Sequence, residues 1–138
     1  MIVSPSEPTE VVIDASVVVK WLKTRDETRV AAARRIRHQH QAGTLILIAP
    51  GLLFLEIMNV AARKWRWPAA RLARLAGRLA GLGLTIEEPS LERVAHWSGL
   101  GLTAYDACYV ALAERRNTVL VTTDEQIKAL GGRWVRPL

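Results

Sequence analysis

The hydrophobic pattern of this 138-residue chain alternates between short apolar runs and longer segments in which apolar residues recur at helical spacing. The short runs contain many β-branched residues and end at polar or turn-forming residues, which is typical of buried parallel strands. We expect strands over residues 11–13, 44–49, 84–87 and 119–122, with an edge strand at 134–135.

The longer segments place apolar residues three and four positions apart, which predicts amphipathic helices. Capping residues, glycine and proline mark their ends. We expect a short helix that Ser16 caps, and helices over residues 27–41, 52–66, 69–82, 89–97, 103–116 and 124–130. Strands that alternate with helices predict an α/β fold, with a central, mostly parallel sheet of four to five strands and helices on both faces.

Four acidic residues interrupt these apolar segments, namely Asp14, Glu56, Asp106 and Asp124. Burial of a lone carboxylate beside a core costs several kcal/mol unless something compensates it. Asp14 and Asp124 follow predicted strands, and Asp106 lies in the first turn of a predicted helix. Because ligands of parallel sheets bind beyond the carboxyl ends of the strands, we expect these three side chains to converge.

Glu56 needs a separate argument, because it lies within a predicted helix whose neighbouring residues are apolar. Asn59 follows three residues later, so a carboxylate and an amide share one side of this helix. The alternative is that Glu56 is a surface residue beside Arg63. The other three acids favour a place for Glu56 in the same site.

Carboxylates that converge must either take up protons or bind a cation, since two charges ~4 Å apart repel by about 4 kcal/mol at an effective dielectric constant of 20. An oxygen-only ligand set suits Mg²⁺ or Mn²⁺ better than zinc. Such an ion acidifies bound water and neutralises charge on a phosphate group. The four acids therefore predict a hydrolase that acts on phosphodiester bonds.

The charge balance is 19 Lys and Arg against 13 Asp and Glu, with a formal net charge of +6. This excess favours an anionic partner such as nucleic acid, although solvated helix faces over residues 25–37 and 63–78 also explain it. The five tryptophans lie mostly in amphipathic segments, which favours core or interface positions over base stacking.

Length and composition predict one domain over residues 11–138, preceded by a flexible tail over residues 1–10. The sequence contains a single cysteine, no apolar run of membrane-spanning length and no N-terminal segment typical of a signal peptide. We therefore expect a cytoplasmic protein without a membrane partner.

Four ordered segments resemble the PIN-domain ribonucleases, in particular the VapC toxins of bacterial type II toxin–antitoxin systems: VVIDASVVVKWL, PGLLFLEIMNVAAR, LTAYDACYVALAERR and VLVTTDEQI. The resemblance extends from about residue 11 to residue 130. It implies a three-layer α/β/α fold, Mg²⁺-dependent RNA cleavage, a homodimer and a small VapB-like antitoxin. The metal-binding and catalytic acids that it implies are Asp14, Glu56, Asp106 and Asp124, with Ser16, Asn59 and Thr123 as supporting polar residues.

Three other functions remain open. A housekeeping RNA-processing nuclease would use the same acids without an antitoxin. A receiver domain that accepts a phosphoryl group has a similar length, but it needs two acids together after the first strand, whereas Asp14 stands alone. A non-catalytic RNA-binding module would need only the basic surface, and it leaves the four acids unexplained.

Overall fold

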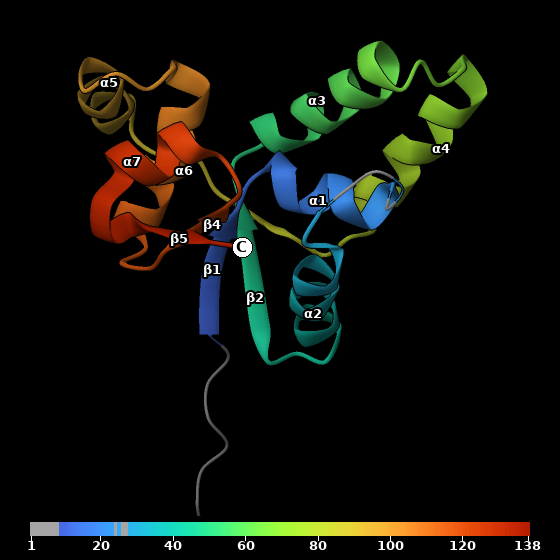
Figure 1. Ribbon diagram of the computed structural model, residues 1–138, viewed down its shortest axis with the longest axis horizontal. Helices are drawn as coiled ribbons and strands as arrows, with labels where there is room; N and C mark the ends of the chain where they lie inside the picture. Colours follow the sequence, from blue (N-terminus) through green and yellow to red (C-terminus); the bar gives the residue numbers. More distant parts are fainter. Residues whose placement is uncertain (1–8, 24, 26–27) are drawn as a thin grey trace, which may run out of the picture.

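The computed structural model describes residues 9–23, 25 and 28–138. Within these residues, five strands form one parallel sheet in the order β3-β2-β1-β4-β5 (Figure 1). The strands are β1 (Thr9–Ile13), β2 (Leu45–Ala49), β3 (Thr85–Ile86), β4 (Leu120–Thr122) and β5 (Val135–Pro137). The predicted α/β fold with a parallel sheet is confirmed.

The central strand is β1, in which Val12 pairs with Ile48 of β2 and with Leu120 of β4. All three side chains are buried, as expected for strands that helices cover on both faces. β1 begins at Thr9, so the last two residues of the expected tail belong to the sheet. Residues 1–8 of that tail lie outside the described residues.

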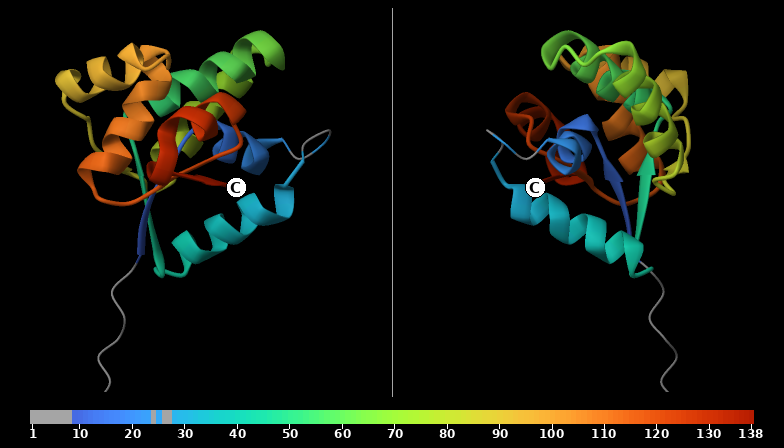
Figure 2. Two further views of the ribbon diagram at one scale, coloured as in Figure 1. Left: turned by 60° about the vertical axis from the view of Figure 1, so that its left-hand side comes forward. Right: turned by 90° about the vertical axis from the view of Figure 1, so that its right-hand side faces the viewer.

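Helices flank the sheet on both sides, with α1 and α2 on one side and α5 and α6 on the other (Figures 1 and 2). The segments are α1 (Ala15–Leu22), α2 (Val30–Gln41), α3 (Leu52–Asn59), the π-helical η1 (Val60–Lys64), α4 (Ala69–Ala80), α5 (Leu91–Gly99), α6 (Ala104–Arg115), α7 (Glu125–Gly131) and the 3-10 segment η2 (Gly132–Trp134). Beyond the carboxyl ends of the strands, α3 and α4 form a hairpin (Figure 1).

Several predicted helix boundaries differ from those in the structure. The N-cap of α1 is Asp14, whose carboxylate accepts a hydrogen bond from the backbone N–H of Ser16, so the prediction that Ser16 caps this helix is wrong. An aspartate at this position satisfies a free N–H group of the first turn. The expected start of the second helix at Glu27 lies outside the described residues, and α2 begins at Val30. α5 begins at Leu91 with Ser90 as its cap, two residues after Pro89.

The core receives residues from every layer, including Leu75 and Leu79 of α4, which are buried. Leu72 and Leu82 pack against the same core. The leucine stripe of residues 69–82 therefore serves the core of its own chain. Among the described residues, no helix combines the length and hydropathy that crossing a bilayer requires.

Candidate active site

A cavity of about 410 Å³ lies at the carboxyl edge of the sheet. Its lining residues are Asp14, Ala15, Ser16, Glu56, Asp106, Tyr109, Thr123, Asp124 and Ile127. The structure thus brings all four predicted acids to one place, each from a different part of the chain. A second cavity of about 430 Å³ lies between α2 and the sheet, and none of its lining residues in the described part of the chain is acidic.

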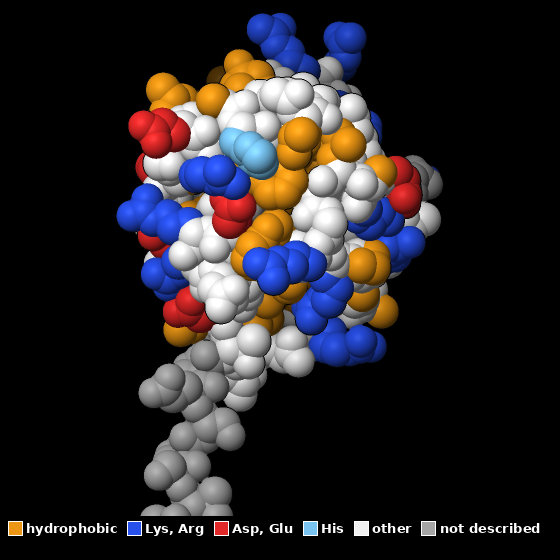
Figure 3. All heavy atoms as spheres, turned by 90° about the vertical axis from the view of Figure 1, so that its left-hand side faces the viewer, with side chains coloured by type: hydrophobic (Ala, Val, Ile, Leu, Met, Phe, Trp, Pro, Cys, Tyr) orange, Lys and Arg blue, Asp and Glu red, His pale blue; other side chains and the backbone are white. Residues whose placement is uncertain are grey.

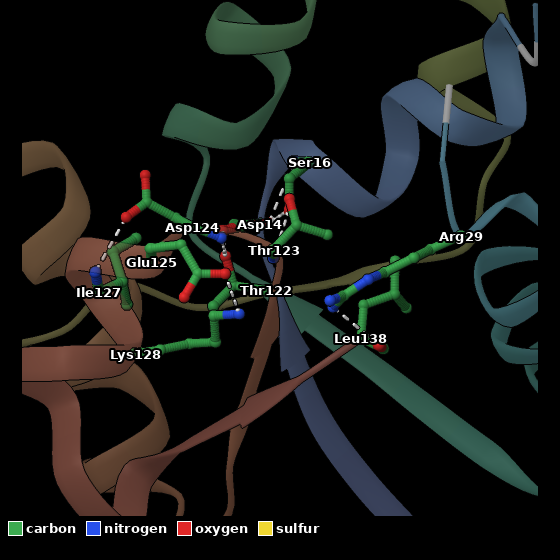
Figure 4. A network of polar contacts seen from close by, with 10 residues as sticks. All are labelled: Asp14, Ser16, Arg29, Thr122, Thr123, Asp124, Glu125, Ile127, Lys128 and Leu138. Carbon is green, nitrogen blue, oxygen red and sulfur yellow. Dashed lines mark hydrogen bonds and ion pairs between the residues drawn. The ribbon is translucent and has the colours of Figure 1, made fainter. Parts of the chain in front are cut away.

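Asp14 is the most enclosed of the four acids, with only 6% of its surface exposed. One carboxylate oxygen accepts hydrogen bonds from the backbone N–H and the hydroxyl of Ser16, and the other accepts one from the hydroxyl of Thr122 (Figure 4). Burial raises the pKa of Asp14, these hydrogen bonds oppose the rise, and the charge of Asp124 adds to it. Its carboxylate is therefore held by neutral donors in an environment that disfavours its charge.

Glu56, in the second turn of α3, faces the same cavity and accepts a hydrogen bond from the hydroxyl of Tyr109. Burial raises the pKa of Glu56, the Tyr109 hydrogen bond lowers it, and the charges of Asp14 and Asp106 raise it again. The surface position that would have paired Glu56 with Arg63 is therefore not observed. Glu56 belongs to the acidic cluster.

Asp106 and Asp124 come from the first turn of α6 and from the N-cap of α7. Burial raises the pKa of Asp106, and the charge of Asp124 raises it further. Asp124 accepts a hydrogen bond of 2.9 Å from the backbone N–H of Ile127, which fixes its position at the start of α7. Thr103 caps α6 by accepting a bond of 3.1 Å from the N–H of Asp106.

Hydroxyl groups connect the ends of β1 and β4 beneath the acids (Figure 4). The Ser16 hydroxyl donates to Asp14 and accepts a bond of 3.2 Å from the backbone N–H of Thr123. The Thr122 hydroxyl donates to Asp14 and accepts one of 3.1 Å from the N–H of Asp124. Each hydroxyl thus orients a carboxylate and also satisfies a backbone donor.

The sequence matches the PIN domain family over residues 11–133. The chain belongs to the PIN-domain family. No curated protein matches it at a significant level of sequence similarity.

Solved structures of similar fold cover nearly the whole PIN domain. PAE2754 from Pyrobaculum aerophilum is 24% identical with a TM-score of 0.66, and the match covers 94% of this chain and 89% of that one. VapC20 from Mycobacterium tuberculosis, described as a toxin that cleaves the sarcin–ricin loop, is 14% identical with a TM-score of 0.65 and coverages of 92% and 99%. VapBC2 from Rickettsia felis, bound to a DNA fragment from its promoter, is 10% identical with a TM-score of 0.62 and coverages of 94% and 98%.

Sequence reasoning on this PIN domain included one residue that lies elsewhere and omitted two that the site contains. Asn59 is exposed at the end of α3 and does not line the cavity. Tyr109 and Thr122 were missed, although Tyr109 lies one helical turn after Asp106 and so shares its side of α6. For Thr122, the sequence shows two consecutive threonines before Asp124, and only the strand pairing decides which hydroxyl faces Asp14.

The donor set of this PIN domain fits a hard divalent cation. Carboxylate and hydroxyl oxygens line the cavity, which suits Mg²⁺ or Mn²⁺. The raised pKa values of Asp14, Glu56 and Asp106 reflect burial and mutual repulsion, and the attraction of a bound cation would offset both effects. In this structure, no three acidic, histidine or cysteine side chains of the described residues lie close enough together to form a complete ion site. Asp14, Glu56, Asp106 and Asp124 are the residues that would hold the ion.

Proposed function

We propose that this PIN domain is a metal-dependent endoribonuclease and the toxin of a type II toxin–antitoxin pair. One observation carries the proposal: four carboxylates from four elements line one cavity and repel one another. None of the lining residues in the described part of the chain is Lys or Arg. A cluster of acids without an internal cation is suited to binding a metal ion and not to stabilising the fold.

When bound, Mg²⁺ or Mn²⁺ would act as a Lewis acid that acidifies water and neutralises charge on the scissile phosphate. The residues of the chain have a separate task, which is to present oriented oxygen ligands. Ser16 and Thr122 fix both oxygens of Asp14, and Tyr109 fixes one oxygen of Glu56. Such hydrogen bonds behind a ligand reduce the reorganisation that metal and substrate binding require.

The direct test is to incubate the purified protein with total RNA in the presence of Mg²⁺, of Mn²⁺ or of excess EDTA. We expect cleavage that requires a divalent ion and stops with the chelator. The Asp106→Asn variant is the control for a contaminating nuclease, and its fold is checked by circular dichroism. Full activity in EDTA, or equal activity of wild type and Asp106→Asn, would contradict the proposal.

The toxin role is supported by the fold that this chain shares with VapC20, whose description names it a toxin, and with the VapBC2 complex. Expression of the wild type alone should arrest growth of a bacterial host, and co-expression of a small cognate antitoxin should relieve the arrest. An arginine of that partner could bind the carboxylate cluster through paired hydrogen bonds. Equal growth with soluble wild type and soluble Asp106→Asn would favour the housekeeping nuclease instead.

We also propose that two copies of the chain associate. An apolar hollow of about 260 Å³ lies between α3 and α4, with Phe54, Leu55, Met58, Ala76, Leu79 and Ala80 as its lining. Leu55 is 71% exposed beside this hollow, and contact with a second copy would bury both. Light scattering should show a dimer that Leu55→Glu dissociates, and a monomeric wild type at high micromolar concentration would contradict this.

A further inference from the structure

The segment over residues 60–80, here called the basic arm, carries an unbalanced positive charge. It contains no Asp or Glu and six basic residues, Arg63, Lys64, Arg66, Arg71, Arg74 and Arg78. All six are exposed, and none forms an ion pair within the described part of the chain. Like charges gathered without counter-charges repel one another, so the arm would be stabilised by an anionic partner.

An aromatic pair lies at the tip of the basic arm. The ring centroids of Trp65 and Trp67 are 5.1 Å apart, and both side chains are half-buried. The ammonium group of Lys23, after α1, lies 5.4 Å from the centroid of Trp65, and the guanidinium of Arg71, in α4, lies 3.8 Å from that of Trp67. Two rings and two cations from three elements thus form one cluster.

The backbone at this tip departs from regular helical geometry. The π-helical turn η1 ends with a bond of 3.1 Å from the N–H of Trp65 to the carbonyl of Val60. Arg66 then adopts a φ of 55°, a left-handed conformation that costs energy in a residue with a long side chain. In a regular helix, two residues two positions apart point in nearly opposite directions. The irregular backbone is therefore what places Trp65 beside Trp67.

Two paths connect this cluster with the acidic cavity. Lys23 lies nine positions after Asp14, and Trp65 lies nine positions after Glu56. At ~1.5 Å per α-helical residue, the path along α1 is about 13 Å long, and the path that includes the π-helical turn is somewhat shorter. Because α1 packs against α3, both paths run in the same direction away from the strand ends (Figure 1). A nucleic acid strand advances ~3.4 Å per stacked nucleotide, so about four nucleotides would span the distance.

We propose that Trp65, Trp67, Lys23 and Arg71 form a subsite for single-stranded RNA, about four nucleotides from the phosphodiester bond that is cleaved. The inference rests on the proposed ribonuclease function and adds the route of the substrate strand. A base can stack on Trp65 while the Lys23 ammonium group binds a phosphate. The guanidinium of Arg71, close to Trp67, can bind a second phosphate. An acidic protein would also satisfy the charge, but the paired rings favour bases.

The test is binding of a fluorescent single-stranded RNA of about 12 nucleotides to the full chain, measured by anisotropy. Asp106→Asn serves as the background, so that RNA stays intact. In this background, we expect Trp65→Ala to weaken binding by about 5- to 100-fold, the effect of one lost stacking contact, and Trp65→Phe to restore most of it. Arg71→Ala should reduce the slope of log affinity against log salt by about 0.7, the value for one lost phosphate contact.

The matched control is Arg133→Ala, because Arg133 lies 4.3 Å from the ring of Trp134 and repeats the cation–aromatic pair outside the arm. It removes the same charge, and we expect less than a two-fold effect. Arg71 is exposed, and Lys23 follows the last residue of α1. Their alanine variants therefore test the subsite even if Trp65→Ala does not fold.

Three outcomes overturn the inference. The first is RNA binding by Lys23→Ala and Arg71→Ala that equals binding by Arg133→Ala, while the parent chain with Asp106 still cleaves RNA. In that case, the ribonuclease function stands and only the subsite falls. The second is that Lys23→Ala and Arg71→Ala bind RNA normally but no longer bind a synthetic amphipathic helical peptide with one leucine face and one glutamate face. This result would make the arm a protein-docking surface. The third is absence of both RNA binding and cleavage by the parent chain, which removes the proposed function as well.

Discussion

The two ends of α6 hold carboxylates in opposite electrostatic environments. Asp106, in the first turn, faces the cavity, and burial and then the charge of Asp124 raise its pKa. Glu114, in the last turn, accepts hydrogen bonds of 2.7 and 2.8 Å from the guanidinium of Arg93, which lower its pKa. Twelve residues of one helix thus include one acid that lacks a compensating cation and one that has it.

Glu114 has an ion-pair partner, whereas Asp106 faces other carboxylates in the cavity. On the face seen in Figure 3, basic and acidic side chains lie next to one another. The ion pairs of the described residues include Arg93–Glu114, Arg115–Glu87 and Arg116–Glu10. The cavity acids receive hydroxyl and backbone donors instead. Unpaired buried carboxylates do not favour stability, which is consistent with the metal-binding role proposed above.

The largest expected difference between Asp106 and Glu114 is in activity. Asp106→Asn should lower RNA cleavage by more than about 100-fold, because it removes a ligand charge and not a supporting contact. Glu114→Gln, eight residues later in the same helix, should leave the cleavage rate within about two-fold, since neither Glu114 nor its partner Arg93 lines the cavity. Initial rates on one defined RNA measure both, and an Asp106→Asn protein as active as Glu114→Gln would refute the assignment.

Binding of an ion should raise the thermal stability of proteins that retain the cavity acids. If Mn²⁺ binds the folded cavity, a concentration 100 times its Kd stabilises the wild type by about 2.7 kcal/mol, which raises Tm. Asp14→Asn should show little of this rise, and Glu114→Gln should show all of it. Thermal unfolding with and without Mn²⁺ tests this independently of cleavage. An equal Tm increase in all three proteins would place the ion elsewhere.

A smaller effect is expected for the residues that orient the acids. Thr122→Val and Tyr109→Phe each remove one hydroxyl donor to a carboxylate while preserving shape. Loss of such a supporting bond typically lowers metal affinity or activity by about 10- to 100-fold. Titration with Mn²⁺ followed by calorimetry separates weaker ion binding from a change of fold, which circular dichroism monitors. If both variants bind Mn²⁺ with wild-type affinity, the two hydroxyls do not support ion binding.

The smallest effect is in the pH dependence of stability without divalent ions, and its sign differs between the two groups of acids. The folded-state pKa of Asp14 is raised above 3.8, so the folded state binds the carboxyl proton more tightly than the unfolded state. Stability therefore falls as pH rises from 3.8 through the raised pKa. The folded-state pKa of Glu114 is lowered below 4.5, so its stabilisation is present above 4.5 and is lost as pH falls through the lowered value.

In EDTA, Asp14→Asn should therefore have a higher Tm than the wild type at neutral pH and a similar one at low pH. Glu114→Gln should have a lower Tm at neutral pH and a similar one at low pH. Calorimetric scans from about pH 3 to pH 7 measure both curves. A neutral-pH Tm of Asp14→Asn below that of the wild type would mean that the charged form of Asp14 stabilises the fold.

The fold class and the convergence of the four acids could be predicted from the sequence, because both depend on local patterns. The β-branched runs predict strands, and Asp14 and Asp124 follow two of them. Because parallel strands bring their carboxyl ends to one edge of the sheet, these two acids were expected to lie close together. Charge within apolar segments was a sufficient signal for Glu56 and Asp106. Helix caps at Thr103 and Asp124 were also predictable, since a cap contacts residues only a few positions away.

Contacts between distant segments set which polar residues bond to those acids and which tryptophans pair. The bond from Tyr109 to Glu56 joins residues 53 positions apart, and the bond from Thr122 to Asp14 joins residues 108 apart. Helical periodicity suggested Asn59, but the direction of its side chain depends on how α3 packs. The pairing of Trp65 with Trp67 likewise depends on the π-helical turn and on the left-handed Arg66. Contacts between distant segments follow from packing, and the sequence pattern carries no direct record of it.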